Sequence, residues 1–306
     1  MRAGAKADAQ GHNGPLGSGG VTADHTEVFE RFGIPSQESI YPYAPVFTGL
    51  IDGVRVAVKR THDAEAMGRW VRRLKELGLP VVTPLAGPYE IGDDHWVAYP
   101  WVEGRAYDGS ERDVAAAGEL LGRLHAAGTK EGLGDFGWPD HDEASVQEDV
   151  DGLAPYTSRF DEPLRAFMTT TLPAIRDAGL PVAEVSMDYK AVNLVYTGEG
   201  PVLVDPDNGE RAPRLLDLAL AALLFHNDLD GEPARVFTAA EWASFRDGYL
   251  RHVELTERER ELWPTALLYM MLEWGVWTVI NGEWHLDRHA RFLTDLLALD
   301  LGRYAL

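Results

Sequence analysis

The residue types best suited to catalysis lie in one short segment, residues 185–208, which reads VSMDYKAVNLVYTGEGPVLVDPDN. Within it, Asp188 precedes Asn193 by five residues, and Asp205 follows two apolar stretches. Transfer of a phosphoryl group to a hydroxyl needs a carboxylate beside the attacking oxygen. It also needs oxygen ligands that hold Mg²⁺ against the phosphates, such as an amide oxygen and a second carboxylate. The segment therefore predicts Asp188 as the catalytic base and Asn193 and Asp205 as magnesium ligands.

A β-hairpin would bring these groups together. The two apolar stretches are joined by the turn sequence at residues 197–200, so Asp205 is expected to return beside Asn193. Lys190 follows Asp188 by two residues and is expected to offset charge as the phosphoryl group moves, with a solvated loop lysine as the alternative. Taken alone, Asp188 would more often be a turn or helix-capping residue.

A second lysine, Lys59, ends the apolar strand pattern of residues 54–58. It needs an anionic partner there, because an unpaired buried charge is costly. ATP phosphates and Glu65 on the following helix are the candidates, and an edge-strand lysine facing solvent is the alternative. Farther along, the Pro100 carbonyl and the Val102 amide would match the edge of adenine, unless these residues form a plain linker.

The order of strand and helix patterns predicts an α+β chain of two lobes. Residues 1–24 are rich in Gly, Ala and small polar residues and are expected to form a disordered tail. Residues 25–100 favour a small, β-rich, nucleotide-binding lobe with one main helix. Residues 101–104 then form a hinge, and residues 105–306 a large helical lobe for catalysis and substrate binding.

Periodicity and turn residues predict the individual elements. Strands are expected at residues 41–50, 54–60, 81–85, 89–91 and 95–99, with a tight turn at Asp52-Gly53. Helices are expected at residues 26–32, 64–77, 112–127, 164–178 and 213–225, and over most of the chain after 237. Thr238 with Glu241, and Thr256 with Glu259, have the spacing of the capping box that begins a helix.

Bulk properties narrow the class of protein. With 306 residues, 45% of them hydrophobic and 25% charged, the chain is typical of a globular protein. The absence of cysteine excludes disulfides and thiolate chemistry. The net charge of −21 disfavours nucleic acids and acidic membranes and favours a small cationic substrate, although acidity can also serve solubility alone. Without a visible secretory signal or a long apolar run, a cytoplasmic location is expected.

The late helical region carries further candidates for a substrate site. Its tryptophans are expected mainly in the core, with one or two stacking on a cation: Trp274, Trp277 and Trp284. The acidic residues that could receive amines are Asp228, Asp230, Glu232, Glu273 and Glu283. His285 and His289 have zinc-pair spacing, but ordinary helix-surface residues are the favoured interpretation.

These motifs resemble those of the aminoglycoside phosphotransferase family, whose fold is that of protein kinases. The resemblance covers about residues 46–224, and its most specific parts are SMDYKAVN at 186–193, VLVD at 202–205 and RLLDLA at 214–219. The family's pattern H-x-D-x-x-x-x-N implies a catalytic Asp188 and a metal-binding Asn193. Its second metal aspartate falls on Asp205, its strand lysine on Lys59, its hinge on residues 100–102 and its R-L-H helix on residues 123–125.

The sequence departs from the family pattern at three places. Ser186 stands where the catalytic loop usually has histidine. Residues 41–45, Tyr-Pro-Tyr-Ala-Pro, stand where a glycine-rich loop would cover the phosphates. The separation of Lys59 and Glu65 is shorter than the family often has.

The resemblance implies a protein-kinase-like, bilobal enzyme that uses ATP, or alternatively GTP, together with Mg²⁺. The expected reaction is phosphorylation of a hydroxyl of a small cationic antibiotic, which would confer resistance. An aminoglycoside or a basic cyclic peptide of the viomycin and capreomycin kind would fit. One alternative is a metabolite kinase for choline, homoserine or a sugar. Another is a protein of the same fold that binds nucleotide or ligand without turnover. The sequence leaves the oligomeric state open.

Overall fold

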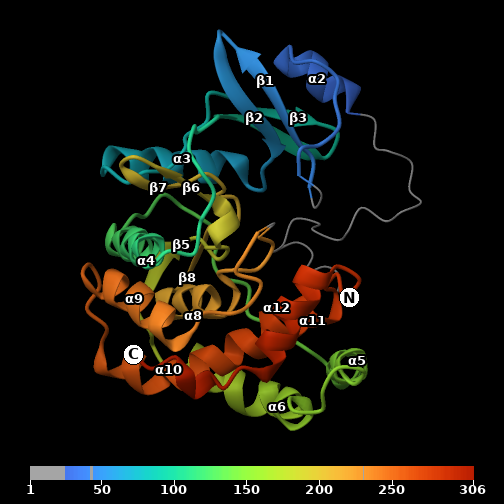
Figure 1. Ribbon diagram of the computed structural model, residues 1–306, viewed down its shortest axis with the longest axis vertical. Helices are drawn as coiled ribbons and strands as arrows, with labels where there is room; N and C mark the ends of the chain where they lie inside the picture. The colour runs from blue at the N-terminus through green and yellow to red at the C-terminus, as the bar shows by residue number, and fades with distance from the viewer. Residues whose placement is uncertain (1–24, 42–43, 230) are drawn as a thin grey trace.

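The computed structural model describes residues 25–41, 44–229 and 231–306, so the expected tail at residues 1–24 lies outside the described residues. Two lobes are visible in Figure 1, a small one with the sheet and a larger one built mainly of helices. The α+β, two-lobed architecture expected from the sequence is therefore confirmed. The small lobe contains α2 (Thr26–Phe32), β1 (Val46–Ile51), β2 (Val54–Arg60), α3 (Ala64–Glu76), β3 (Ala86–Ile91) and β4 (Asp94–Pro100).

The large lobe contains most of the helices and four short strands. Its α-helices are α4 (Glu111–Ala126), α5 (Glu143–Leu153), α6 (Asp161–Ala166), α7 (Leu172–Arg176), α8 (Arg214–Leu224), α9 (Ala239–Leu250), α10 (Glu257–Met270), α11 (Val276–Ile280) and α12 (Asp287–Ala298). Its strands are β5 (Val182–Val185), β6 (Leu194–Thr197), β7 (Gly200–Leu203) and β8 (Glu210–Pro213). The π-helices η1 (Phe167–Thr171) and η3 (Met271–Gly275) and the 3₁₀ turns η2 (Ala191–Asn193) and η4 (Leu301–Arg303) complete it.

The small lobe is an antiparallel four-stranded sheet with the strand order β1-β2-β4-β3. The β1–β2 hairpin turns at Asp52 and Gly53, whose positive φ angles of 51° and 80° suit the tight turn predicted there. Apolar residues of α2 pack on the sheet through Phe29 and Phe32, next to Phe47 and Trp96. The sheet therefore has a buried face of its own, and Lys59 lies at the end of its second strand.

Two expected strands differ from the structure. The strand expected at 41–50 begins only at Val46, whose amide donates to the Ser39 hydroxyl at 2.9 Å, and the same hydroxyl donates to the Ala44 carbonyl at 2.9 Å. The strand expected at 81–85 does not form, since Pro80 and Pro84 lack amide donors. Instead, the Val82 amide donates to Leu203 of β7 at 3.1 Å, so this segment ties the two lobes together.

The large lobe forms its core where helices approach closely. A Cβ atom at Gly118 of α4 would lie 1.9 Å from the Phe245 carbonyl of α9, so only glycine allows this approach. Both predicted capping boxes are present, at Thr238 of α9 and Thr256 of α10. The expected helix at 164–178 is instead broken into α6, η1 and α7. This packed lobe supports the strand pair β5–β8 and the hairpin β6–β7.

Candidate active site

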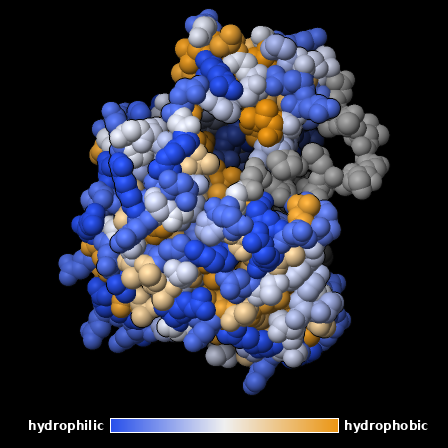
Figure 2. Space-filling view, in the orientation of Figure 1, coloured by the Kyte–Doolittle hydropathy of each residue, from blue (hydrophilic) through white to orange (hydrophobic). Residues whose placement is uncertain are grey.

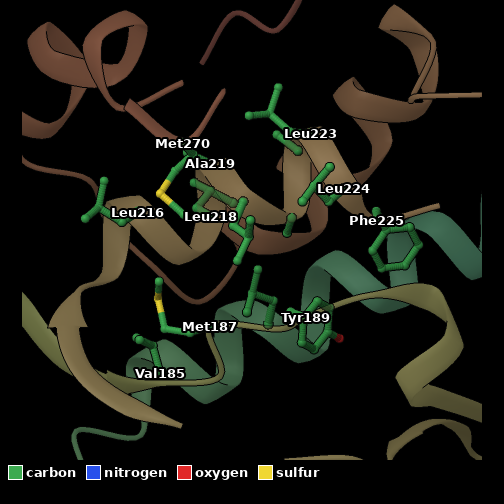
Figure 3. Close-up of a cluster of buried hydrophobic side chains, with 14 of the residues drawn as sticks. Val185, Met187, Tyr189, Leu216, Leu218, Ala219, Leu223, Leu224, Phe225 and Met270 are labelled. Atoms are coloured by element: carbon green, nitrogen blue, oxygen red, sulfur yellow. The ribbon is translucent and has the colours of Figure 1, made fainter. Parts of the chain in front are cut away.

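The loop after β5 alternates buried apolar and partly buried polar side chains. Met187 and Tyr189 point into the core against α8, as Figure 3 shows. Asp188 and Lys190, which alternate with them, line a cavity of about 280 Å³ between the lobes. The loop backbone is strained at Met187, where φ is +52°. Figure 2 shows the recess between the lobes. Burial of Met187 and Tyr189 thus fixes the side chains of Asp188 and Lys190 in the cavity.

The loop keeps a firm anchor although Ser186 replaces the usual histidine. The Ser186 amide donates to Asp217 Oδ2 at 3.0 Å. The same oxygen lies 3.0 Å from His125 Nε2, and the other ring nitrogen of His125 lies 2.9 Å from the hydroxyl of Tyr249. Asp217 and His125 are both buried. These two residues, from the D-L-A and R-L-H motifs, hold the loop through its backbone, so the side chain at position 186 is not needed for this contact.

Lys190 lies between two carboxylates. Its Nζ atom is 2.8 Å from Asp188 Oδ1 and 3.1 Å from Asp228 Oδ2. Burial raises the pKa of the Asp188 carboxyl above its ordinary value, although Lys190 acts in the opposite direction. For Asp228, burial is outweighed by Lys190 and His289, so its pKa is lowered to about 2. Asp228 therefore stays charged and retains Lys190, while Asp188 becomes a better proton acceptor.

The β6–β7 hairpin places the two expected metal ligands at one end. Leu194 pairs with Leu203, and the Val204 amide donates to the Asn193 carbonyl at 3.0 Å. Asn193 and Asp205 consequently line the same cavity as Asp188. The Asn193 amide nitrogen donates to Asp188, so its Oδ1 atom faces away from that residue. With the Asp205 side chain 43% exposed, the arrangement offers the hard oxygen ligands that suit Mg²⁺.

Lys59 is anchored differently from the expectation. Its Nζ atom contacts Asp205 and lies 2.8 Å from Asp207 Oδ2. Burial lowers the pKa of the Lys59 ammonium, but the two carboxylates more than offset this, so the pKa is raised. Glu65 is exposed on α3 and is not a partner of Lys59. Lys59 therefore does not form the expected ion pair with Glu65, because Glu65 lies in the first turn of α3 and is exposed to solvent.

The expected adenine-binding residues lie where the chain leaves the small lobe. The Trp101 amide donates to the Arg55 carbonyl of β2 at 2.8 Å. Because groups alternate along an extended chain, the Pro100 carbonyl and the Val102 amide face the opposite edge. Val102 packs on the buried cluster that includes Val82 and Tyr99, together with Val202 and Val204 of the large lobe. Apolar side chains of both lobes thus meet beside a hydrogen-bond acceptor, the Pro100 carbonyl, and a donor, the Val102 amide.

A second cavity, of about 80 Å³, adjoins the first at Asp188 and Lys190. Trp274 and Trp277 form part of its wall, with Asp228, Glu283 and His289. His289 Nε2 lies 3.6 Å from Asp228 Oδ1, and His289 Nδ1 lies 3.6 Å from Glu283 Oε2. The cavity is therefore both aromatic and acidic, which suits a cation.

The remaining candidates from the sequence lie elsewhere or have other partners. Trp284 stacks on Tyr156 with ring centroids 4.2 Å apart. Glu273 forms a buried pair with His141 at 2.7 Å, and Glu232 pairs with Arg291 at 2.7 Å. Asp230 lies outside the described residues. His285 is exposed whereas His289 is buried, and the described residues include no cluster of three His, Cys, Asp or Glu side chains able to hold a metal.

The sequence model of the phosphotransferase enzyme family matches residues 54–263. The chain belongs to this family. It is accordingly a phosphotransferase with a hydroxyl group as acceptor, as the sequence predicted. No significant match was found among curated proteins.

Solved structures support the same fold for the phosphotransferase. An aminoglycoside phosphotransferase from Alicyclobacillus acidocaldarius is 18% identical, with a TM-score of 0.56, over 92% of this chain and 98% of its own. An amicoumacin kinase, solved with AMP-PNP and Ca²⁺, is 17% identical, with a TM-score of 0.62, over 92% and 97%. A microcompartment-associated aminopropanol kinase is 14% identical, with a TM-score of 0.65, over 90% and 94%. At these identities the likeness establishes the protein-kinase-like fold.

Sequence reasoning missed three features of the phosphotransferase site. Asp207 binds Lys59, although the two residues are far apart in the sequence. Asp228 was one of several acidic candidates, and nothing local showed that it would pair with Lys190. Tyr41, from the segment that replaces the glycine-rich loop, lines both cavities.

Within the described part of the chain, no helix has the length and apolarity needed to cross a bilayer.

Proposed function

We propose that this phosphotransferase transfers the γ-phosphoryl group of ATP to a hydroxyl of a small cationic molecule, with a cationic antibiotic as its substrate. The observation that carries the proposal is the position of Asp188 and Lys190, which line both cavities. The larger cavity offers the Lys59 ammonium and the side-chain oxygen atoms of Asn193 and Asp205, which a metal–triphosphate needs. The smaller cavity offers aromatic and acidic side chains for the substrate. A catalytic base at their junction can reach a hydroxyl on one side and the phosphorus atom on the other.

In the proposed reaction, Asp188 accepts the hydroxyl proton while the acceptor oxygen forms a bond to the γ-phosphorus. The bond from that phosphorus to the oxygen of ADP breaks, and ADP leaves. Lys190, held by Asp228, offsets negative charge on the moving group. Mg²⁺ held by Asn193 and Asp205 would supply the charge neutralisation that phosphoryl transfer requires.

The nucleotide is proposed to bind between the lobes, with its base where the chain leaves the small lobe, at residues 100–102. There, the Pro100 carbonyl and the Val102 amide would pair with the base edge, and the apolar cluster around Val82 and Val204 would cover its faces. Lys59 would contact the phosphates. A cytoplasmic location, where ATP is available, is part of the proposal.

Charge and aromatic groups support a cationic substrate. Asp228 and Glu283 lie beside Trp274 and Trp277 in the second cavity, and a cation there would gain from both the carboxylates and the ring faces. The net charge of −21 would attract a cation over longer range. The fold likeness to an aminoglycoside phosphotransferase and to an amicoumacin kinase makes antibiotics the first compounds to test.

A second candidate is a kinase for a small amino alcohol. The second cavity, of about 80 Å³, is small beside the ~300–1,000 Å³ typical of ligand sites, and a compact amine would fill it. The likeness to an aminopropanol kinase points in the same direction. Choline or a similar metabolite would satisfy the same groups.

The test is a panel of aminoglycosides, basic cyclic peptides, choline and amino alcohols, each incubated with ATP and Mg²⁺ and analysed by mass spectrometry. We expect one or more cationic compounds to gain a single phosphoryl group, and Asp188→Asn to remove the product. A neutral polyol phosphorylated in preference to every cation would contradict the substrate class. Expression in sensitive cells then separates an antibiotic kinase, which raises resistance, from a metabolite kinase, which does not.

A further inference from the structure

The partners of Lys59 come from the other lobe. In the kinase pattern, this lysine pairs with a glutamate of the helix that follows its strand. Here that helix, α3, carries only Glu65 and Glu76, and neither pairs with Lys59. Lys59 contacts Asp205 and Asp207 instead, which follow β7 in the large lobe. The ion pair therefore crosses the cavity between the lobes rather than lying within one of them.

Asp207 is bound by a set of side chains from the small lobe. Besides Lys59, its Oδ2 atom accepts from the Thr61 hydroxyl at 3.2 Å, and its Oδ1 atom faces the Tyr99 hydroxyl at 3.5 Å. Lys59 and Thr61 are two residues apart on an extended chain, so both face the same side. Tyr99 is on the neighbouring strand β4, and its ring centroid lies 5.2 Å from Lys59 Nζ. Three side chains of one sheet face thus converge on a single carboxylate.

The two carboxylates differ in exposure. The Asp207 side chain is 14% exposed and that of Asp205 is 43% exposed. Asp205 lies toward the open cavity beside Asn193, where a nucleotide-bound metal would compete for its oxygens. Asp207 lies behind it, among hydroxyl groups that hold its orientation. One partner of Lys59 is therefore free to be exchanged for a phosphate, whereas the other is built into the contact between the lobes.

We propose that Asp207 is a positioning residue that replaces the missing helix glutamate and holds Lys59 for the phosphates of ATP. This inference rests on the proposed function. When nucleotide binds, Lys59 exchanges Asp205 for phosphate oxygens and keeps Asp207. The orientation of Lys59 then depends on the approach of the two lobes and not on α3, which is fixed in the large-lobe core through Met67 and Trp70.

A double-mutant cycle tests whether Asp207 acts through Lys59. The affinity of MgATP is measured by calorimetry for the wild type, Asp207→Asn, Lys59→Met and the double variant. Asparagine keeps the shape of Asp207 and can still bind the two hydroxyl groups. We expect each single change to weaken binding at least tenfold and the double variant to be within twofold of Lys59→Met. If the fold-losses of affinity in the two single variants multiply in the double variant, the two residues act independently and the proposal is overturned.

Three further variants separate the rival roles. Glu65→Gln removes the carboxylate that the kinase pattern would use, and we expect MgATP affinity within twofold of wild type, matched by Glu76→Gln at the far end of α3. Asp205→Asn is expected to raise the Mg²⁺ concentration needed for half-maximal binding, whereas Asp207→Asn leaves it unchanged. A raised Mg²⁺ requirement in Asp207→Asn would make Asp207 a metal ligand and overturn the positioning role.

Kinetics and thermal unfolding complete the test. Asp207→Asn should raise KM for ATP at least tenfold and leave KM for the acceptor within twofold, a split that general loosening of the fold would not produce. The unfolding midpoint without nucleotide should show coupling between Lys59→Met and Asp207→Asn, because the ion pair is present in the free protein. If the wild type phosphorylates an acceptor but Asp207→Asn keeps its affinity for MgATP, only the positioning role fails. If the wild type binds no MgATP, the proposed function fails with it.

Discussion

The side-chain amide of Asn193 donates to Asp188 twice, to its backbone carbonyl at 2.8 Å and to its carboxylate at 3.0 Å. A residue expected from the sequence only to bind metal therefore also orients the proposed base. This double contact is possible because the 3₁₀ turn η2 closes the five-residue separation between the two. The turn also leaves the other amide atom, Oδ1, directed away from Asp188.

The first prediction follows from these two roles. We expect Asn193→Ala to lower kcat by about 10²–10³-fold, because the change removes a metal ligand and the hydrogen bonds that orient the base. Steady-state kinetics over a range of Mg²⁺ concentrations measures both effects. Added Mg²⁺ should restore only part of the rate. Full recovery at high Mg²⁺ would show that the contact with Asp188 has no catalytic effect.

The second prediction concerns Asp188 itself. We expect Asp188→Ala to reduce transfer by roughly 10²–10⁴-fold, the usual contribution of a positioned base, while MgATP affinity changes less than fivefold. The fold should persist, because Lys190 keeps Asp228 as its partner and the buried Met187 and Tyr189 still fix the loop. Turnover and calorimetry are the measurements, with circular dichroism as the control for folding. Turnover within threefold of wild type would remove Asp188 from the mechanism.

The third prediction concerns Asp205. We expect Asp205→Ala to weaken binding of ATP in the presence of Mg²⁺ by at least tenfold and to have a much smaller effect on ATP without metal. Loss of this carboxylate leaves Lys59 with Asp207 as its single anionic partner, so the lysine remains charged and in place. Calorimetric titrations with and without Mg²⁺ give the comparison. Equal losses under both conditions would mean that Asp205 acts through Lys59 and not through a metal.

The sequence predicted several local features because neighbouring residues determine them. The hairpin that returns the chain from Asn193 to Asp205 depends on a turn of a few residues, and it is present in the structure. The two capping boxes and the Asp52-Gly53 turn were predicted for the same reason. Wherever side-chain type and spacing decide the geometry, the chain alone is enough.

The features that the sequence did not predict depend on contacts between distant segments. Glu65 was a candidate partner of Lys59 because it was near in sequence, yet the two residues that bind Lys59, Asp205 and Asp207, are 146 and 148 positions away. The segment at 81–85 has strand-forming residues, but two prolines limit its pairing with β7 to Leu203, which donates to the Pro80 carbonyl and accepts from the Val82 amide. Trp274 and Trp277 were expected mainly in the core, and only the packing of the late helices brings them to a cavity.

The fourth prediction concerns substrate selection. Glu283 lines the second cavity and lies 3.6 Å from His289. We expect Glu283→Gln to raise KM for a cationic acceptor about 5–20-fold and to change kcat little, because a lost charge contact affects ground-state and transition-state binding alike. The exposed Glu76→Gln on α3 is the matched control. Kinetics with a cationic acceptor and a neutral isostere measure the preference for the cation, which should be smaller in Glu283→Gln than in the wild type. Equal changes in KM for both acceptors would place Glu283 outside the substrate site.

The last prediction is a pH dependence of stability that comes from Glu210 on β8. Burial raises the pKa of this carboxyl from 4.5 to about 7. The folded state therefore binds more protons than the unfolded state between these two values, so the contribution of Glu210 to stability declines as pH rises from 4.5 to 7. Glu210→Gln keeps the shape of the side chain and removes the charge. We expect this variant to have the higher unfolding midpoint at pH 8, with the difference from wild type shrinking toward pH 5.5. The difference between the two unfolding curves over this pH range reports on Glu210, and a difference that stays constant with pH would show that burial does not raise the pKa of this carboxyl.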